Sequence, residues 1–142
     1  MQNKQYDATK HICFNIGRVM RRVYDHYEQR LAEFHLTPPQ YFVFNALCMG
    51  DGITAGELGE RVHLDGSTLT GILDRMERSG YVERRPNPAD RRSVLINLTG
   101  KGHEVAPRIL EFADELDAKL REPFSSREIE IFECVLKAIA ER

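Results

Sequence analysis

Two adjacent arginines in the second half of the chain offer its clearest chemistry. Arg91 and Arg92 follow a Pro-Asn-Pro turn at 86–88 and precede residues 94–98, where apolar side chains recur at every second position. Guanidinium groups on a thin loop can pair with phosphates or enter a narrow, electronegative minor groove. The residues expected to share one buried strand face are Val94, Ile96 and Leu98. The segment therefore predicts a hairpin with a cationic tip, which is the layout of a DNA-binding wing.

A polar cluster opens a predicted helix shortly before this hairpin. Residues 65–67 supply the helix start, and Gly80 suits the left-handed residue that ends a helix. Small polar side chains in the first turn of a helix can reach base edges in the major groove. The predicted readers of base edges are Ser67, Thr68 and Thr70. Ser67 is equally suited to capping the helix, and the two roles are compatible.

The cations are concentrated around these two elements, although the net charge of the chain is −2. Between Arg75 and Arg92 there are six arginines and three acidic residues. Arg75 and Arg78 are predicted to reach phosphate or to brace the wing through Asp90, and Arg91 to contact the DNA backbone. The sequence therefore favours a nucleic-acid partner, because the location of charge matters more than its sum.

Cys13 is the one candidate for regulated chemistry. It stands near the start of a predicted helix that also carries Tyr27, whereas Cys48 and Cys134 lie on apolar faces and are expected in the core. The three cysteines are widely spaced, without a Cys-x-x-Cys pair, and the five histidines are scattered. The sequence thus predicts neither a disulfide framework nor a metal site, and no cofactor.

Helical elements must position these groups. Apolar residues recur at three and four positions through the first forty residues, which predicts one long helix extending to Phe34. Thr37 with Gln40, Thr54 with Glu57 and Ser125 with Glu128 have the spacing of capping boxes that open further helices. The helix that begins at Thr54 is predicted to end near His63, and Thr99 to cap another. The predicted wing strands are 81–85 and 93–98.

Composition limits the other classes of protein. The chain has 142 residues and is 42% hydrophobic, which fits one domain or one intertwined subunit. It lacks the roughly 20 consecutive apolar residues of a membrane span, and its first residues lack the apolar core of a signal peptide. The predicted location is the cytoplasm, without a membrane partner. Phosphate loops, nucleophile elbows and paired carboxylates in an apolar setting are absent from the sequence, so an enzyme is not expected.

The end of the wing carries a spaced pattern: Asp-x-Arg, five residues, Leu-Thr, two residues, Gly. Its members are Asp90, Arg92, Leu98, Thr99 and Gly102. The pattern resembles that of the MarR family of bacterial regulators, in which Arg92 would be the wing residue inserted into the minor groove. The resemblance implies a mainly α fold with a small β-hairpin wing: one MarR-like subunit, 1–142. It further implies a winged helix-turn-helix lobe at 37–100 and a helical dimerisation region at 1–36 and 101–142.

The predicted function is that of a homodimeric transcriptional regulator, a repressor that a small ligand releases from a pseudo-palindromic operator. Two recognition helices must lie about 34 to 36 Å apart to enter successive major grooves, so a small change in spacing removes DNA affinity. Aromatic residues near the junction could hold a phenolic effector, although their helical spacing is also typical of a core. These residues are Tyr24, Tyr27, Tyr41 and Phe44.

Two alternatives remain open. The pair Cys13-Phe14 and Tyr27 resemble the organic-peroxide-sensing branch of the family, in which an oxidant at the cysteine replaces the ligand. Gly17 and Pro38 stand where that branch has further tyrosines. The alternative from another class is a winged-helix module that binds protein, which would favour an apolar or acidic recognition helix.

Overall fold

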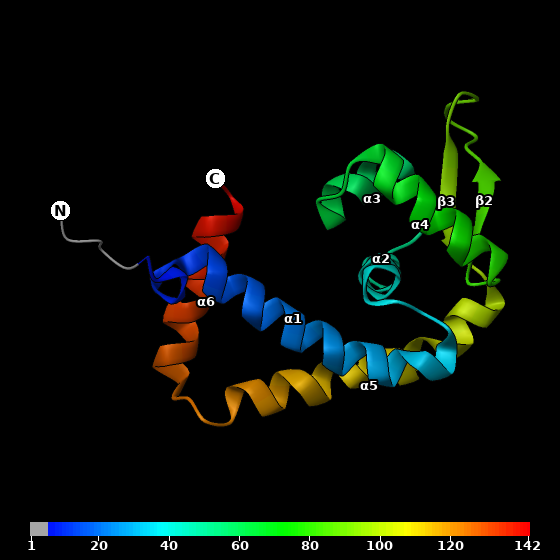
Figure 1. Cartoon of the computed structure of the whole chain (residues 1–142). Helices are drawn as coiled ribbons and strands as arrows, with labels where there is room; N and C mark the ends of the chain where they lie inside the picture. Colours follow the sequence, from blue (N-terminus) through cyan, green and yellow to red (C-terminus); the bar gives the residue numbers. More distant parts are fainter. Residues whose placement is uncertain (1–5) are drawn as a thin grey trace. The chain divides into compact units, whose positions relative to one another are not determined.

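The computed structural model describes residues 6–142 (Figure 1). Residues 1–5, part of the expected dimerisation region, lie outside the described residues. The chain divides between Ala106 and Pro107 into two compact units. The division falls inside helix α5, Gly100–Arg121, at a proline that has no backbone N–H to donate.

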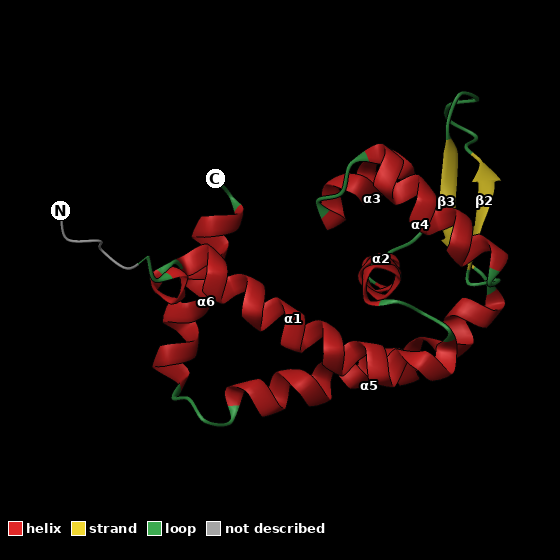
Figure 2. Ribbon diagram, in the orientation of Figure 1, coloured by secondary structure: helices red, strands yellow, loops and turns green. Residues whose placement is uncertain are grey.

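The first unit carries a helical lobe with a small sheet at one side (Figure 2). Its sheet is antiparallel with the strand order β1-β3-β2. The elements in chain order are η1 Ala8–Lys10, α1 Ile12–Leu31, η2 Ala32–Phe34, α2 Pro38–Cys48, β1 Ile53–Thr54, α3 Ala55–Val62, α4 Gly66–Arg78, β2 Val82–Pro86 and β3 Val94–Leu98. The second unit contains the rest of α5 and helix α6, Ser126–Ala140. No helix among residues 6–142 is long and apolar enough to cross a membrane.

The predicted helix starts are confirmed. Thr37, Thr54 and Ser125 each accept from the backbone three residues on, and the side chain at that third residue accepts from the cap backbone. The first helix is shorter than predicted, because α1 ends at Leu31 and a 3-10 turn carries the chain to Phe34. His63 ends α3 in the left-handed conformation, and Gly80 follows α4 with φ of 77°.

The core of the lobe lies where α2, α3, α4 and β3 pack together. The buried face of α4 is the predicted apolar stripe. Leu47 of α2, Leu58 of α3 and Ile96 of β3 are also buried, all at 1% exposure or less. The stripe consists of Leu69, Ile72, Leu73 and Met76. Burial of this face fixes the rotation of α4, so that the side chains on its opposite face point outward.

Both wing strands begin one residue later than predicted, and the two-residue strand β1 was not predicted. The expectation that Val94 is buried was wrong: Ile96 and Leu98 are buried, but Val94 is 40% exposed. Val94 pairs with Pro86 at the outer end of the hairpin, whereas Ile96 pairs with both Ile53 and Arg84. The lobe therefore covers the part of β3 that contains Ile96 and Leu98 and leaves the outer end at Val94 exposed.

The root of the wing is a close backbone contact that requires glycine. A Cβ atom at Gly102 would lie 2.6 Å from the carbonyl oxygen of Tyr81. The Gly102 N–H donates to Thr99 Oγ1 at 3.1 Å, and Thr99 Oγ1 donates to the carbonyl of Gly80. These contacts join the end of α4, the start of β2 and the start of α5.

Helices α1 and α6 each carry apolar side chains that are exposed in the single chain. On α1 they are Ile12, Phe14, Ile16, Val19, Met20 and Tyr24, and on α6 they are Ile131, Phe132, Val135, Leu136 and Ile139. Contiguous apolar surface of this kind marks an interaction site in soluble proteins.

Candidate nucleic-acid interface

The first turn of α4 is organised by Asp65, which is its N-cap. Asp65 Oδ1 accepts from the Thr68 N–H at 2.9 Å and from Ser67 Oγ at 2.7 Å, and Asp65 Oδ2 accepts from Thr68 Oγ1 at 2.7 Å. Thr70 Oγ1 donates to the Gly66 carbonyl at 2.7 Å. The structure thus places all three predicted base readers on the exposed side of one helix turn, and capping belongs to Asp65 rather than Ser67.

These hydrogen bonds fix the direction in which the hydroxyl protons of Ser67 and Thr68 point. The backbone hydrogen bond from Thr68, followed by the hydroxyl bonds from Ser67 and Thr68, lowers the pKa of Asp65 well below its ordinary value of 3.8. An ionised carboxylate only accepts, so both hydroxyls must donate their protons to it. The side of each hydroxyl that faces solvent therefore presents lone pairs.

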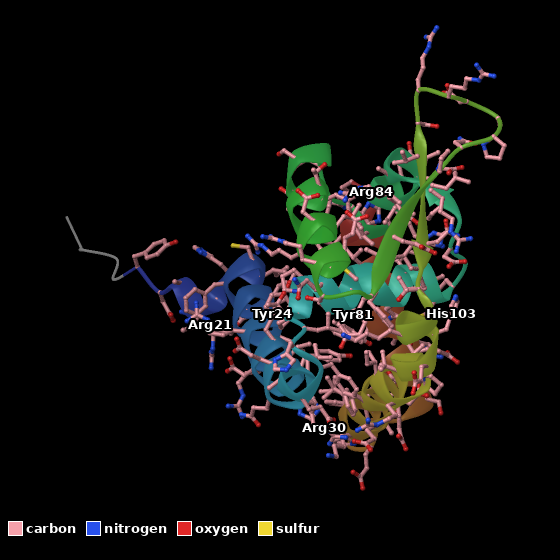
Figure 3. The ribbon with its side chains drawn as sticks, turned by 90° about the vertical axis from the view of Figure 1, so that its right-hand side faces the viewer. Arg21, Tyr24, Arg30, Tyr81, Arg84 and His103 are labelled. Atoms are coloured by element: carbon pink, nitrogen blue, oxygen red, sulfur yellow. The ribbon has the colours of Figure 1, made fainter. Side chains whose placement is uncertain are left out.

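The wing tip is held by its own backbone. Asp90 Oδ1 accepts from the Arg92 N–H at 2.9 Å, and the Asp90 carbonyl accepts from the Ser93 N–H at 3.1 Å. Asn87 Nδ2 donates to Ser93 Oγ at 2.8 Å across the loop. Arg91 and Arg92 are exposed, and Figure 3 shows nitrogen-bearing side chains extending from this tip. The loop is therefore ordered while its cations stay free to meet an anion.

The expected bridge from α4 to the wing through Asp90 is not among the contacts of residues 6–142. Arg75 and Arg78 are exposed, and Arg78 Nε donates to the Asp74 carbonyl on its own helix. Asp90 lies in the loop beyond the ends of β2 and β3, where its carboxylate accepts from the Arg92 N–H. Its bracing role is thus local to the wing tip.

Arg84 on β2 makes the connection instead. Its guanidinium contacts Asp74 Oδ1 at 2.7 Å and Glu77 Oε2 at 2.5 Å, and the backbone N–H of Arg84 donates to Glu77 Oε1 at 3.3 Å. Figure 3 shows Arg84 between α4 and the wing strands. Partial burial lowers the pKa of Arg84, but hydrogen bonds with Asp74 and then Glu77 outweigh it and raise the pKa above its ordinary value. Sequence reasoning missed this residue.

An open groove of about 520 Å³ lies between the start of α3 and the wing. Residues 54–56 form one side of it. The other side consists of Asn87, Asp90, Arg92, Ser93 and Val94. The groove brings Arg92, the carboxylate of Asp90 and the start of α3 to one surface.

The redox candidates lie apart within one chain. Cys13 is exposed in the first turn of α1, whereas Tyr27 is 7% exposed and stacks on Tyr41 with ring centroids 4.5 Å apart. The two positions are fourteen residues apart on α1, which corresponds to about 21 Å along the helix axis. Tyr41 and Phe44 are buried, and Tyr24 is 37% exposed.

The other two cysteines differ from expectation. Cys48 is half-buried, and desolvation together with the charge of Asp51 raises the pKa of its thiol. Cys134 was expected in the core but is exposed, and no residue of α6 is buried. The surroundings of Cys48 therefore disfavour its thiolate.

A pair of helices followed by a β-hairpin, with polar and cationic groups on α4 and on the hairpin tip, defines a winged helix-turn-helix protein. The sequence profile of the MarR family matches residues 35–93. The organic hydroperoxide resistance transcriptional regulator of Bacillus subtilis (strain 168) is 36% identical over 105 residues, which are 72% of this chain and 71% of that protein. The chain belongs to the MarR family and is a transcriptional regulator.

Two solved structures are similar over most of their length. The PcaV transcriptional regulator from Streptomyces coelicolor, in complex with its natural ligand, has a TM-score of 0.86 and 28% identity, and the match covers 96% of both chains. A mutant of MarR from E. coli complexed with operator DNA has a TM-score of 0.82 and 28% identity, with 90% of this chain and 92% of that chain covered. These relatives are regulators rather than enzymes.

Proposed function

We propose that the chain is a homodimeric repressor that binds a pseudo-palindromic operator through α4 and the wing. The observation that carries this proposal is the pairing of an exposed polar first turn on α4 with an ordered cationic wing tip in one compact unit. The related MarR structure on operator DNA supports it. In this proposal the protein acts by binding and not by catalysis, and it works in the cytoplasm, where it meets DNA.

The lobe at 37–100 reads bases through the first turn of α4. Ser67 and Thr68 present acceptor lone pairs because Asp65 takes their protons. In the major groove the exposed amino donors are adenine N6 and cytosine N4. We therefore expect these two hydroxyls to prefer adenine or cytosine, with Thr70 contacting an adjacent base.

The cations supply affinity and register. Arg75 reaches phosphate beside the major groove, and Arg91 contacts the backbone beside the wing. Arg92 enters the adjacent minor groove, where the potential is most negative over A·T-rich steps. A protein-binding helix with an apolar or acidic face fits this surface less well. The first turn of α4 exposes hydroxyl groups, and the exposed acids Asp74 and Glu77 are paired with Arg84.

Dimerisation covers the exposed apolar faces of α1 and α6. We assign it to residues 1–36 and 101–142, where the exposed side chains include Phe14, Val19, Phe132 and Leu136. Leaving such contiguous apolar surface in water is unfavourable by roughly 25 cal/mol per Å². Association of two copies removes this cost and sets the spacing between two reading lobes.

Release follows from a change in that spacing when a small effector binds. PcaV in complex with its natural ligand supports an effector-controlled mechanism. A phenolic compound is our first candidate, since Tyr24, Tyr27 and Phe42 form a contiguous aromatic group with centroid separations near 6 Å. The effector needs only to bind one lobe spacing better than the other.

The proposal is tested by selection of binding sites from random duplex DNA, followed by fluorescence anisotropy on the enriched duplex. We expect enrichment of an inverted repeat. The binding constant should fall as salt is added, and a plot of its logarithm against the logarithm of the salt concentration should have a slope of about −0.9 per phosphate contacted. Absence of any enriched sequence would contradict base readout. A complex that contains one chain per duplex would contradict the dimer.

A second candidate function is oxidant sensing through Cys13, favoured by its exposure and by the organic hydroperoxide resistance relative. In this account a hydroperoxide oxidises the Cys13 thiolate to a sulfenic acid and is itself reduced to the alcohol. Hydroperoxide at a stoichiometric amount should release wild type from DNA and leave Cys13→Ser bound. Equal behaviour of the two proteins favours the ligand mechanism.

A further inference from the structure

We propose that Arg84 is a positioning residue for operator binding: by holding Asp74 and Glu77 of α4 from strand β2, it sets the distance and angle between the recognition helix and the wing. The inference rests on the proposed function, in which both elements contact one duplex. It assigns Arg84 no contact with DNA.

The geometry is that of a fork that spans two elements. One terminal nitrogen of the guanidinium lies 2.7 Å from Asp74 Oδ1 and the other lies 2.5 Å from Glu77 Oε2. The backbone N–H of Arg84 donates to Glu77 Oε1, so Glu77 holds both the strand and the side chain. Asp74 and Glu77 are three residues apart and therefore lie on the same side of α4.

The place of Arg84 in the hairpin explains why this fork matters. Arg84 is opposite Ile96 in the strand register, and Ile96 is fully buried in the lobe. Two residues further out, Pro86 pairs with Val94, where burial has already ended. Arg84 is therefore the outermost side chain of β2 that contacts α4. Its contacts set the direction in which the wing tip extends from the lobe.

The recognition helix α4 and the wing bind one duplex tightly only when the distance between them matches the spacing of its grooves. Affinity falls when a supporting contact is lost, because the wing must then be ordered at the moment of binding. A surface ion pair adds little to folding stability, so the effect should appear in DNA binding more than in unfolding.

The neighbouring residue offers a matched control. Arg85 is also an arginine on β2, but its side chain is 62% exposed, against 26% for Arg84, and it pairs with Glu83 on the same strand. Arg85→Gln removes a cation of equal charge, one residue away, that ties no other element. A general effect of charge on DNA affinity would appear in both variants.

The test is a double-mutant cycle in full-length protein, with affinity for the selected operator measured by anisotropy. Arg84→Gln should weaken binding about tenfold and Arg85→Gln less than twofold. In an Arg92→Ala background, Arg84→Gln should cost no more than about twofold, because the wing contact that Arg84 positions is already absent. The affinity of Arg84→Lys should lie between that of wild type and that of Arg84→Gln, since an ammonium cannot span both carboxylates as a guanidinium does.

A neutral triple variant separates positioning from charge. Arg84→Gln with Asp74→Asn and Glu77→Gln removes the tie without leaving two bare carboxylates near phosphate. We expect its affinity to stay low. Recovery to the wild-type value would overturn the inference in favour of simple neutralisation.

Three further results would count against it. Equal losses in Arg84→Gln and Arg85→Gln would overturn it, and so would the same fold loss with and without Arg92. Unfolding of Arg84→Gln at the assay temperature, with Arg84→Lys binding as wild type, would also overturn it. Failure of the wild-type protein to bind any duplex would instead refute the proposed function itself.

Discussion

Replacing Asp65 with asparagine should change which base the recognition helix prefers while leaving the helix intact. Asparagine is as good an N-cap as aspartate, and its carbonyl oxygen can still accept from the Thr68 N–H and from Ser67 Oγ. Its amide nitrogen then takes the place of Asp65 Oδ2, 2.7 Å from Thr68 Oγ1. Because that nitrogen donates, the Thr68 proton is free to turn outward.

The size of the effect follows from one hydrogen bond in each half-site. A single mismatched bond at a base edge costs about 1 to 1.5 kcal/mol, and two half-sites double it to about 2 to 3 kcal/mol. The preference at the base contacted by Thr68 should therefore shift by about 30- to 150-fold. The direction is from the amino groups of adenine or cytosine towards the acceptor groups of guanine or thymine.

The assay is selection from random duplexes by wild type, Asp65→Asn and Thr68→Val, followed by anisotropy on the two best sites. Thr68→Val keeps the shape and removes the hydroxyl, so it should lose preference at the same position. An Asp65→Asn profile identical to that of wild type would refute the reasoning, as would changes scattered over positions that Thr68→Val leaves unaffected.

Four further predictions follow from the fold. Arg92→Ala should weaken binding more on A·T-flanked than on G·C-flanked operators, and equal losses in anisotropy would indicate a phosphate contact instead. Gly102→Ala should lower the free energy of unfolding by roughly 1 to 3 kcal/mol in urea titration, because its Cβ would meet the Tyr81 carbonyl at 2.6 Å; an unchanged midpoint would contradict this contact. The lowered pKa of Asp65 in the folded state means that its contribution is complete above the unfolded value near 3.8 and is lost as pH falls towards the folded value, so Asp65→Asn should lose less stability than wild type below pH 3.8. Phe132→Glu should produce monomers in sedimentation at micromolar concentration, and an unchanged dimer would remove α6 from the interface.

The local parts of the fold could be predicted because their causes are local. A Thr or Ser with Gln or Glu three residues later is a complete capping unit, and all three such units form as expected. The apolar stripe of α4 was likewise fixed by helical periodicity. The two-residue strand β1 has no periodicity to detect, and it exists only because β3 lies beside it.

The errors concern contacts between distant residues. Val94 fits the strand alternation, but the alternation does not say where the lobe ends. Arg84 lies two residues after Val82 on the same side of β2, so an inward cation with Asp74 and Glu77 on one side of α4 was a usable signal. Cys134 has an apolar setting in the sequence, yet it is exposed, because helical periodicity does not say whether another element covers that face.

Footprinting of the selected operator with hydroxyl radicals tests the central claim most directly. If two lobes read one duplex through α4 and the wing, protection should be two-fold symmetric, with major-groove half-sites one helical turn, about 10 base pairs, apart. Minor-groove protection should flank each half-site and disappear in Arg92→Ala. A single continuous protected stretch without symmetry, or flanks unchanged by that substitution, would contradict the account.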